Sequence, residues 1–330
     1  MLKPPAEDTA LTRPANERVR PSLSWRKMTL ALHPRFVAFL GFAVLLTAVF
    51  IKPLFWLAAG AIQSELDSYI VLVPFISAYL IYDRRKRLSK EYGSSLWAII
   101  PLITGFIALA TALGLHRSGG YLSDHDYLAL IAFSFVCFLA ADGFLFLGRN
   151  WMTAAAFPFA FLIFMVPMPD AMAEALETGS KLASAEAANW FFNLTGTPVL
   201  REGRVFQLPN IVIEVAQECS GIRSSWVLFI TSLLAANLFL KSAWRRAVLV
   251  CFVIPLGIVR NGFRVAVIGI LCINWGPQMI HSIIHRRGGP LFFVLSLIPL
   301  FLLLLWLRRG DLTKDQGQRS EFQSNHPKSA

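Results

Sequence analysis

Cysteine is scarce in this chain, with four residues in 330, and no two of them form a Cys-x-x-Cys pair. Zinc ribbons, thioredoxin-like redox motifs and disulfide frameworks depend on paired cysteines, so none of them is supported. Cys137, Cys251 and Cys272 lie inside apolar stretches, where a thiol packs as a small hydrophobic side chain. Cys219 differs, because it lies at the border of an apolar stretch.

Charge is also scarce: 15% of the residues are charged and 55% are hydrophobic. A soluble domain of this length does not have that composition, whereas a polytopic membrane protein does. The net charge of +11 could suggest a nucleic-acid partner. The basic residues, however, cluster between the apolar stretches, as the positive-inside rule expects for a membrane protein. Nucleic-acid binding is therefore not predicted.

The apolar stretches predict an all-α, polytopic transmembrane helical bundle of about eight spans. The second and fifth spans are short and need tilt or re-entrant ends. No internal repeat relates the spans to one another. Their predicted bounds are Phe36–Leu57, Tyr69–Tyr82, Leu96–Leu115, Tyr127–Leu147, Met152–Met168, Ser225–Leu240, Ala247–Ile273 and Pro290–Leu307.

The distribution of lysine and arginine predicts how the chain is oriented. Both tails and the loops at 84–87 and 241–246 carry most of these residues, which places both termini in the cytoplasm. Residues 1–35 and 308–330 are expected to be disordered cytoplasmic tails, and residues 36–307 form the membrane domain. The first apolar stretch is long enough to remain as an anchor rather than be cleaved as a signal peptide.

One outward segment, residues 169–224, is long. Its first part, Asp170 to about Leu194, has the pattern of an amphipathic helix lying on the membrane surface. Its second part has β-branched runs broken by Pro198, Gly203 and Pro209, which predicts short β structure. An extended run from Ile211 would carry Cys219 on one face to the outer membrane surface; the alternative is an irregular loop.

Cys219 belongs to a polar hexapeptide, Glu-Cys-Ser-Gly-Ile-Arg, at the start of an apolar span. Gly221 permits close backbone approach and Ser220 can cap the helix that follows. A helix N-terminus and the nearby Arg223 both favour the thiolate form of a cysteine. The alternative is a capped helix start with an inert thiol.

Polar side chains also interrupt the seventh predicted span. Arg260 and Arg264 are four residues apart and share a helix face, with Asn261 beside them. A guanidinium at membrane depth needs a carboxylate, a carbonyl cluster or a water-filled cavity. Because this span runs outward, Arg264 is expected in its outer half, on the side of Cys219. A structural ion pair to Glu218, Asp142 or another acid is the alternative for the arginines.

His281 and His285 are four residues apart just before the last span. Imidazole is the usual proton carrier near neutral pH. An HxxxH pair can also bind metal, but no HExxH motif accompanies it, and a third ligand would have to come from His116, Asp124, His125 or Asp126. No metal and no cofactor are predicted, and His281 can equally be a solvated interfacial residue.

A thiol, an imidazole and a guanidinium that converge on the outer leaflet form the pattern of a nucleophile with its base and an oxyanion stabiliser. A transporter or channel that uses the intramembrane arginines is the alternative. That alternative is disfavoured because there is no inverted repeat and the polar groups gather at one face.

At these residues the chain resembles the exosortase/archaeosortase family of multi-pass membrane transpeptidases. The resemblance rests on Glu-Cys-Ser-Gly-Ile-Arg-Ser ending at Ser224, on Asn-Gly-Phe-Arg ending at Arg264, and on His-Arg-Arg-Gly-Gly starting at His285. Phe-Met-Val-Pro-Met-Pro ending at Pro169 and Gly-Thr-Pro-Val ending at Val199 reinforce it. These elements follow the family's order between about Tyr69 and Phe293.

The resemblance implies Cys219 as the nucleophile, Arg264 as a transition-state or substrate-binding cation, and His285 as the general acid/base. Ser220, Gly221, Arg223, Asn261, Arg260 and His281 are candidate supporting or substrate-binding residues. The implied substrates are secreted proteins with a C-terminal sorting tail: a motif such as Pro-Glu-Pro, a transmembrane helix and a basic cluster. Cleavage would occur at the outer face of the cytoplasmic membrane, with water or a polysaccharide or lipid of the cell surface as acceptor.

Overall fold

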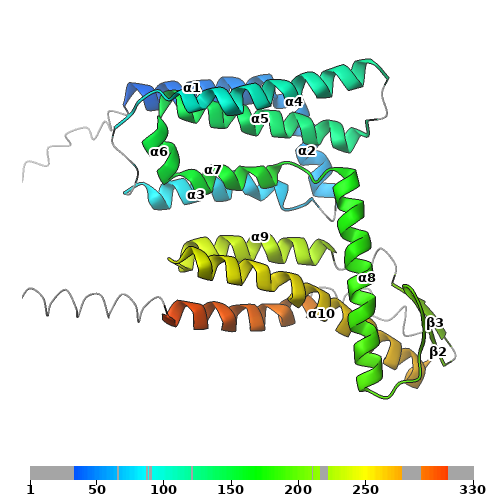
Figure 1. The fold of residues 1–330 in the computed structure, drawn as a ribbon. Coiled ribbons are helices and arrows are strands. Elements are labelled where there is room, and N and C mark those ends of the chain that lie inside the picture. The colour runs from blue at the N-terminus through cyan, green and yellow to red at the C-terminus, as the bar shows by residue number, and fades with distance from the viewer. Residues whose placement is uncertain are drawn as a thin grey trace, which may run out of the picture.

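The computed structural model describes residues 33–64, 67–86, 88, 91–119, 122–209, 211–215, 222–276 and 291–310. Helices make up most of these residues, and a small antiparallel sheet follows helix α8 (Figure 1). The prediction of an all-α membrane bundle with a short β region is therefore confirmed.

Four of the described helices are long and apolar enough to cross a membrane: Leu96–Arg117, α5 (Asp124–Phe146), α10 (Ala243–Trp275) and Leu291–Gly310. The first consists of η2 (Leu96–Ala98) and α4 (Ile99–Arg117). Two bent helix pairs raise the number of candidate spans to six. α9 (Ile222–Phe239), η1 (Ile70–Leu72) and α3 (Val73–Arg84) occupy two further predicted spans. The predicted count of about eight spans is not confirmed.

The first predicted span is two helices rather than one. α1 (Pro34–Val49) and α2 (Ile51–Gln63) meet at Phe50 with a bend of 72°. Pro53 explains the break, because proline has no N–H to donate to the carbonyl of Val49. The apolar pattern continued across the bend, so periodicity alone did not reveal it.

The fifth predicted span is also divided. It contains α6 (Arg149–Ala154), α7 (Ala156–Phe161) and η3 (Leu162–Met165), after which the chain bends by 89° into α8 (Asp170–Leu194). Pro167 and Pro169 flank the bend, and Pro169 is the N-cap of α8. Proline is tolerated at a helix start but cannot extend a preceding helix, so the two prolines separate these segments.

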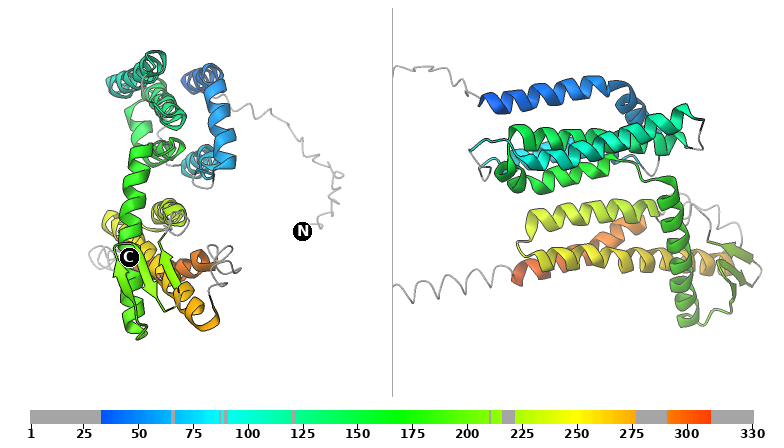
Figure 2. Two further views of the ribbon diagram at one scale, coloured as in Figure 1. Left: turned by 90° about the vertical axis from the view of Figure 1, so that its right-hand side faces the viewer. Right: turned by 45° about the horizontal axis from the view of Figure 1, so that its top comes forward.

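α8 lies across one end of the bundle. The other long helices run side by side, and α8 is roughly perpendicular to them in both side-on views (Figures 1 and 2). The start of α1 and the end of helix Leu291–Gly310 lie at the opposite end (Figure 1). The bounds of α8 are those that the sequence predicted, and its orientation is compatible with the predicted position along a membrane surface.

The predicted β structure is a three-stranded antiparallel sheet of β1 (Leu200–Glu202), β2 (Val205–Leu208) and β3 (Ile211–Glu214). Gly203 takes a positive φ of 61° in the turn between β1 and β2, which suits glycine. Phe206 of β2 is fully buried against Phe192 of α8, with ring centroids 5.4 Å apart. The sheet is therefore fixed to α8 and not independent of the bundle.

Two apolar clusters fill the bundle, one around α1–α7 and one among α9, α10 and helix Leu291–Gly310. Phe164 of η3 joins them, because its ring lies 6.0 Å from that of Trp226 and 6.3 Å from that of Phe229, both on α9. A third cluster unites α8, the sheet and α10. This third cluster lies next to the candidate site.

Candidate active site

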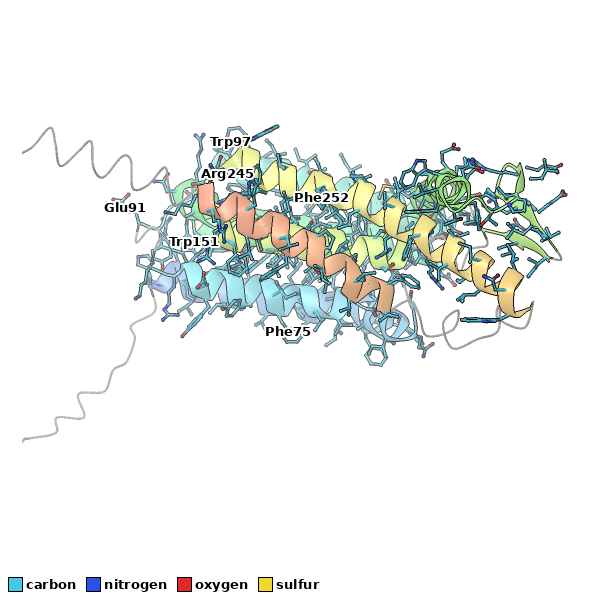
Figure 3. All side chains as sticks on the ribbon, turned by 90° about the horizontal axis from the view of Figure 1, so that it is seen from below. Phe75, Glu91, Trp97, Trp151, Arg245 and Phe252 are labelled. Carbon is cyan, nitrogen blue, oxygen red and sulfur yellow. The ribbon has the colours of Figure 1, made fainter. Side chains whose placement is uncertain are left out.

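Basic side chains gather at the end of the bundle remote from α8. Arg245, near the start of α10, lies at this end (Figure 3) and donates to the carbonyl of Leu307 over 3.0 Å. Arg246 donates to the carbonyl of Leu240, and Arg84 donates to the side chain of Asn237. The carbonyls and amide at the helix ends thus bind the cations that the positive-inside rule assigns to the cytoplasmic side.

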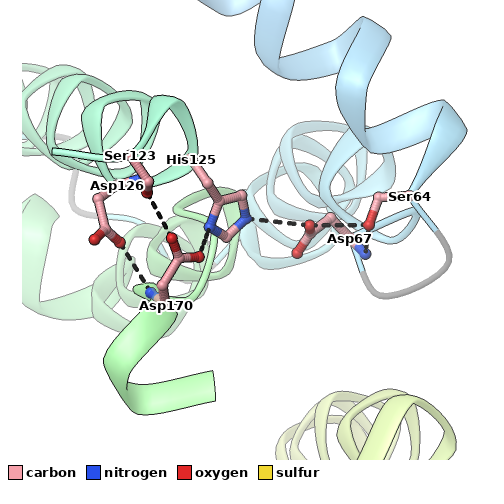
Figure 4. Close-up of polar contacts among 6 residues, drawn as sticks. All are labelled: Ser64, Asp67, Ser123, His125, Asp126 and Asp170. Atoms are coloured by element: carbon pink, nitrogen blue, oxygen red, sulfur yellow. Dashed lines mark hydrogen bonds and ion pairs between the residues drawn. The ribbon is translucent and has the colours of Figure 1, made fainter. Parts of the chain in front are cut away.

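The opposite end carries a cluster of acidic groups around His125. The ring of His125, in the first turn of α5, lies between two carboxylates (Figure 4). Its Nε2 is 3.4 Å from Oδ2 of Asp67, and its Nδ1 is 2.9 Å from Oδ1 of Asp170, the first residue of α8. Asp67 is buried, with a side chain 10% exposed. The histidine therefore joins the segment before η1, α5 and α8.

Further hydrogen bonds fix the bend at which the chain enters α8. Ser123, the N-cap of α5, donates from Oγ to Oδ2 of Asp170 over 2.5 Å. The backbone N–H of Asp170 donates to Oδ1 of Asp126 over 2.9 Å. Together with His125 these contacts hold the start of α8 against the start of α5 (Figure 4). The sequence predicted neither contact, although the Asp-His-Asp run at 124–126 after a serine indicated a polar helix start.

One atom each from His125, Asp126 and Asp170 lies within 4.8 Å of the others, a spacing that a divalent cation could use. The same groups already bond to one another and to Asp67 and Ser123. This network accounts for the cluster as a joint between helices. His125 was among the residues considered as a third ligand for His281 and His285, which lie outside the described residues.

The arginine-bearing part of α10 lies at the level of α8. Counting 1.5 Å per residue from Ala243, Arg264 is about 32 Å along the helix, close to the thickness of a bilayer core. α10 continues to Trp275, well past its contact with α8 at Gly262. Arg264 is half-buried, and it lies in the half of α10 that contacts α8.

Arg260 is buried, with 8% of its surface exposed. Its Nη2 donates to Oγ of Ser224 over 2.6 Å and to Oγ of Ser225 over 3.2 Å. Both serines belong to the first turn of α9, so Arg260 ties the start of α9 to α10. Asp142, which the sequence offered as an ion-pair partner, is buried and forms no hydrogen bond with a described residue.

The Asn-Gly-Phe-Arg motif fixes α10 to its neighbours. Asn261 is buried, with 2% of its surface exposed. A β-carbon on Gly262 would come within 2.8 Å of the backbone nitrogen of Ala188 in α8. The ring of Phe263 lies 5.4 Å from that of Phe191 and 6.2 Å from that of Phe292 at the start of the last helix. The motif that carries Arg264 thus sets where α8 and the last helix cross α10.

Several predicted site residues lie outside the described residues: Cys219, Ser220, Gly221, His281 and His285. Arg223 is part of α9, but its side chain is not among those described. The structure describes Arg260, Asn261 and Arg264, and it brings these three together on one stretch of α10 with the start of α9 and with α8.

A comparison with protein-family models finds a match to the transmembrane exosortase family over residues 56–302. The match begins within α2 and ends within the last helix, and it covers α8, the sheet and all of the candidate site residues. The chain belongs to the transmembrane exosortase family, as the sequence motifs indicated. No curated protein and no solved structure matches the chain. The chain is therefore a multi-pass membrane protein of this family.

Proposed function

We propose that the chain is a membrane-embedded cysteine peptidase or transpeptidase that cleaves C-terminal sorting signals of secreted proteins at the outer face of the cytoplasmic membrane. One observation carries the proposal. The described segments that flank Cys219 and the segment that follows His285 are all anchored to residues 260–266 of α10, the stretch that carries Arg264.

The three anchors involve different kinds of contact. On one side of Cys219, Val215 is buried in one cluster with Val265 and Ala266. On its other side, Ser224 accepts a hydrogen bond from Arg260. After His285, Phe292 lies against Phe263. The described residues next to the three motifs thus contact one stretch of α10, which supports the proposal, although they are far apart in the sequence.

The number of intervening residues limits how far Cys219 and His285 can lie from these three anchors. An extended chain spans about 3.6 Å per residue. Cys219 is four residues from Val215 and five from Ser224, so its α-carbon is within about 14 Å of one and about 18 Å of the other. The limit for His285, seven residues before Phe292, is about 25 Å. These limits are compatible with a nucleophile, a base and Arg264 meeting at one peptide bond.

Three side chains are required for the chemistry. The Cys219 thiolate attacks the carbonyl carbon of the scissile peptide bond and forms a C–S bond, while Arg264 stabilises the oxyanion. The C–N bond then breaks, and protonated His285 gives its proton to the leaving amine. In the second half, neutral His285 takes a proton from the acceptor, whose oxygen or nitrogen attacks the thioester and releases the thiolate.

The acceptor determines the outcome. Water gives hydrolysis, and an amine or hydroxyl on a cell-surface polysaccharide or lipid gives transpeptidation. The substrate is a secreted protein whose tail helix lies in the bilayer beside the enzyme with its basic cluster on the cytoplasmic side. This orientation matches the charge distribution of the enzyme, whose own cations gather at the end remote from α8. The sorting motif then lies at the level of α8.

The test is processing of a co-expressed reporter that ends in a Pro-containing motif, an apolar helix and an arginine cluster. We expect cleavage with the wild type and none with Cys219→Ala, at equal amounts of enzyme in the membrane. Cys251→Ala is the matched control, because Cys251 is an exposed cysteine on the span-forming part of α10. Wild-type cleavage by Cys219→Ala would contradict the proposal and favour the transporter alternative.

A further inference from the structure

We infer that Arg260 is a positioning residue for the reaction: it holds the first turn of α9, and with it the chain that carries Cys219, against α10 one helical turn before Arg264. This inference rests on the proposed function, because it concerns the approach of Cys219 to Arg264. Arg260 does not belong to the three residues with assigned roles in the chemistry.

The contact between α9 and α10 is specific. Arg260 donates to two hydroxyls, those of Ser224 and Ser225. One turn earlier, Gly257 leaves room for the second serine: a β-carbon there would lie 2.7 Å from Oγ of Ser225. The start of α9 therefore packs against Gly257 and binds the guanidinium of Arg260. These two contacts fix its position along the axis of α10.

A structural role alone does not require arginine at this position. Burying a guanidinium costs several kcal/mol, and an apolar side chain of similar volume usually packs two helices at least as well. Arg260 also stands four residues from Arg264 on the same face, a spacing at which like charges repel. The site thus retains two costly cations beside the N-terminus of α9.

Two cations and a helix N-terminus together favour an anion nearby. The reaction needs two anions, the Cys219 thiolate and the oxyanion of the tetrahedral intermediate. We assign different effects to the two arginines: Arg264 contacts the reacting carbonyl, whereas Arg260 acts through α9 and favours the thiolate form of Cys219. Loss of Arg260 should therefore change the reactivity of the free thiol, even without substrate.

The experiment uses full-length protein in native membranes, with Cys137, Cys251 and Cys272 replaced by alanine so that Cys219 is the only thiol. Alkylation of Cys219 by iodoacetamide is measured against pH, and reporter processing is measured in parallel. For Arg260→Met we expect processing to fall at least about tenfold and the pH midpoint of alkylation to rise by about one unit. Arg260→Lys keeps both the charge and an N–H donor for the serine hydroxyls, so it should restore the midpoint, but without the guanidinium fork it should restore only part of the processing.

Two matched controls accompany these variants. Arg245→Met removes a cation of the same helix at the remote end, where it binds the carbonyl of Leu307. Ser232→Ala removes a hydroxyl of α9 that bonds only within its own helix, to the carbonyl of Phe229. Both should keep the wild-type midpoint. The double variant Ser224→Ala, Ser225→Ala should resemble Arg260→Met, and it decides the question if Arg260→Met does not reach the membrane.

The inference is overturned if Arg260→Met, or the double serine variant in its place, keeps the wild-type pH midpoint, whether or not processing is lost. A loss of processing with an unchanged midpoint would mean that Arg260 is only structural. Because alkylation is measured without substrate, these results are separate from the test of the proposed function. That proposal fails if Cys219→Ala still processes the reporter.

Discussion

Gly262 of α10 lies directly against Ala187 of α8, and the two helices are so close that a β-carbon on the glycine would overlap the alanine side chain. This contact is where the helix that carries Arg264 crosses α8. The glycine between Asn261 and Phe263 therefore sets how closely the stretch that carries Arg264 packs against α8.

Gly262→Ala should separate α8 from α10. Overpacking of a tight contact costs about 1–3 kcal/mol, so we expect a lower apparent Tm in detergent and slower reporter processing. Gly114→Ala on α4 is the control, because a β-carbon at that position would have no other atom within 4 Å and alanine is the better helix former. An unchanged Tm for Gly262→Ala would show that the two helices can move apart freely.

Asp67→Asn should destabilise the protein more than Asp170→Asn, although both carboxylates contact His125. The side chain of Asp67 is 10% exposed and that of Asp170 is 52% exposed, so water screens the second pair far more strongly. We expect a loss of about 1–3 kcal/mol for Asp67→Asn and less than about 1 kcal/mol for Asp170→Asn. Thermal unfolding in detergent measures the two losses of stability. A larger loss for Asp170→Asn would show that the contact of His125 with α8 stabilises the protein more than its contact with Asp67.

Arg264→Lys should retain insertion but lose most of the catalytic rate. Lysine keeps the charge but has no planar fork of donors, and removal of one oxyanion donor typically costs about 10²–10³ in kcat. Single-turnover processing of the reporter measures the loss. Arg201→Lys is the control, since Arg201 forms an ion pair with Glu186 over 2.6 Å and is not part of α10. Equal processing rates for Arg264→Lys and Arg201→Lys would show that Arg264 takes no part in the reaction.

Cysteine accessibility tests the predicted orientation. In a cysteine-free background, Thr178→Cys on α8 should react with a membrane-impermeant maleimide added outside intact spheroplasts. Ala243→Cys, at the start of α10, should react only after the membrane is permeabilised. Both residues are exposed in the structure, so any difference reports the side of the membrane. Labelling of Ala243→Cys from outside would reverse the orientation and move the candidate site to the cytoplasm.

The sequence predicted the elements that follow from local chemistry. The amphipathic pattern predicted the bounds of α8, and the proline and glycine positions predicted the strands after it. The bend at Phe50 was missed because hydropathy does not change across it, whereas the turn into α8 was predicted because the amphipathic pattern begins at Asp170. A proline within an apolar run leaves open whether a helix continues, kinks or ends, since neighbouring helices decide which backbone groups find partners.

By itself, the sequence determined that the chain is a membrane protein, which family it resembles, and that Cys219, Arg264 and His285 are the residues to test. Composition and short motifs carry this information because the cost of burying charge is local to each residue. Only the tertiary structure decided that Arg260 binds the serines at the start of α9 and that His125 joins Asp67 to Asp170. Those pairings depend on how helices distant in the sequence cross, and side-chain packing between them sets that geometry.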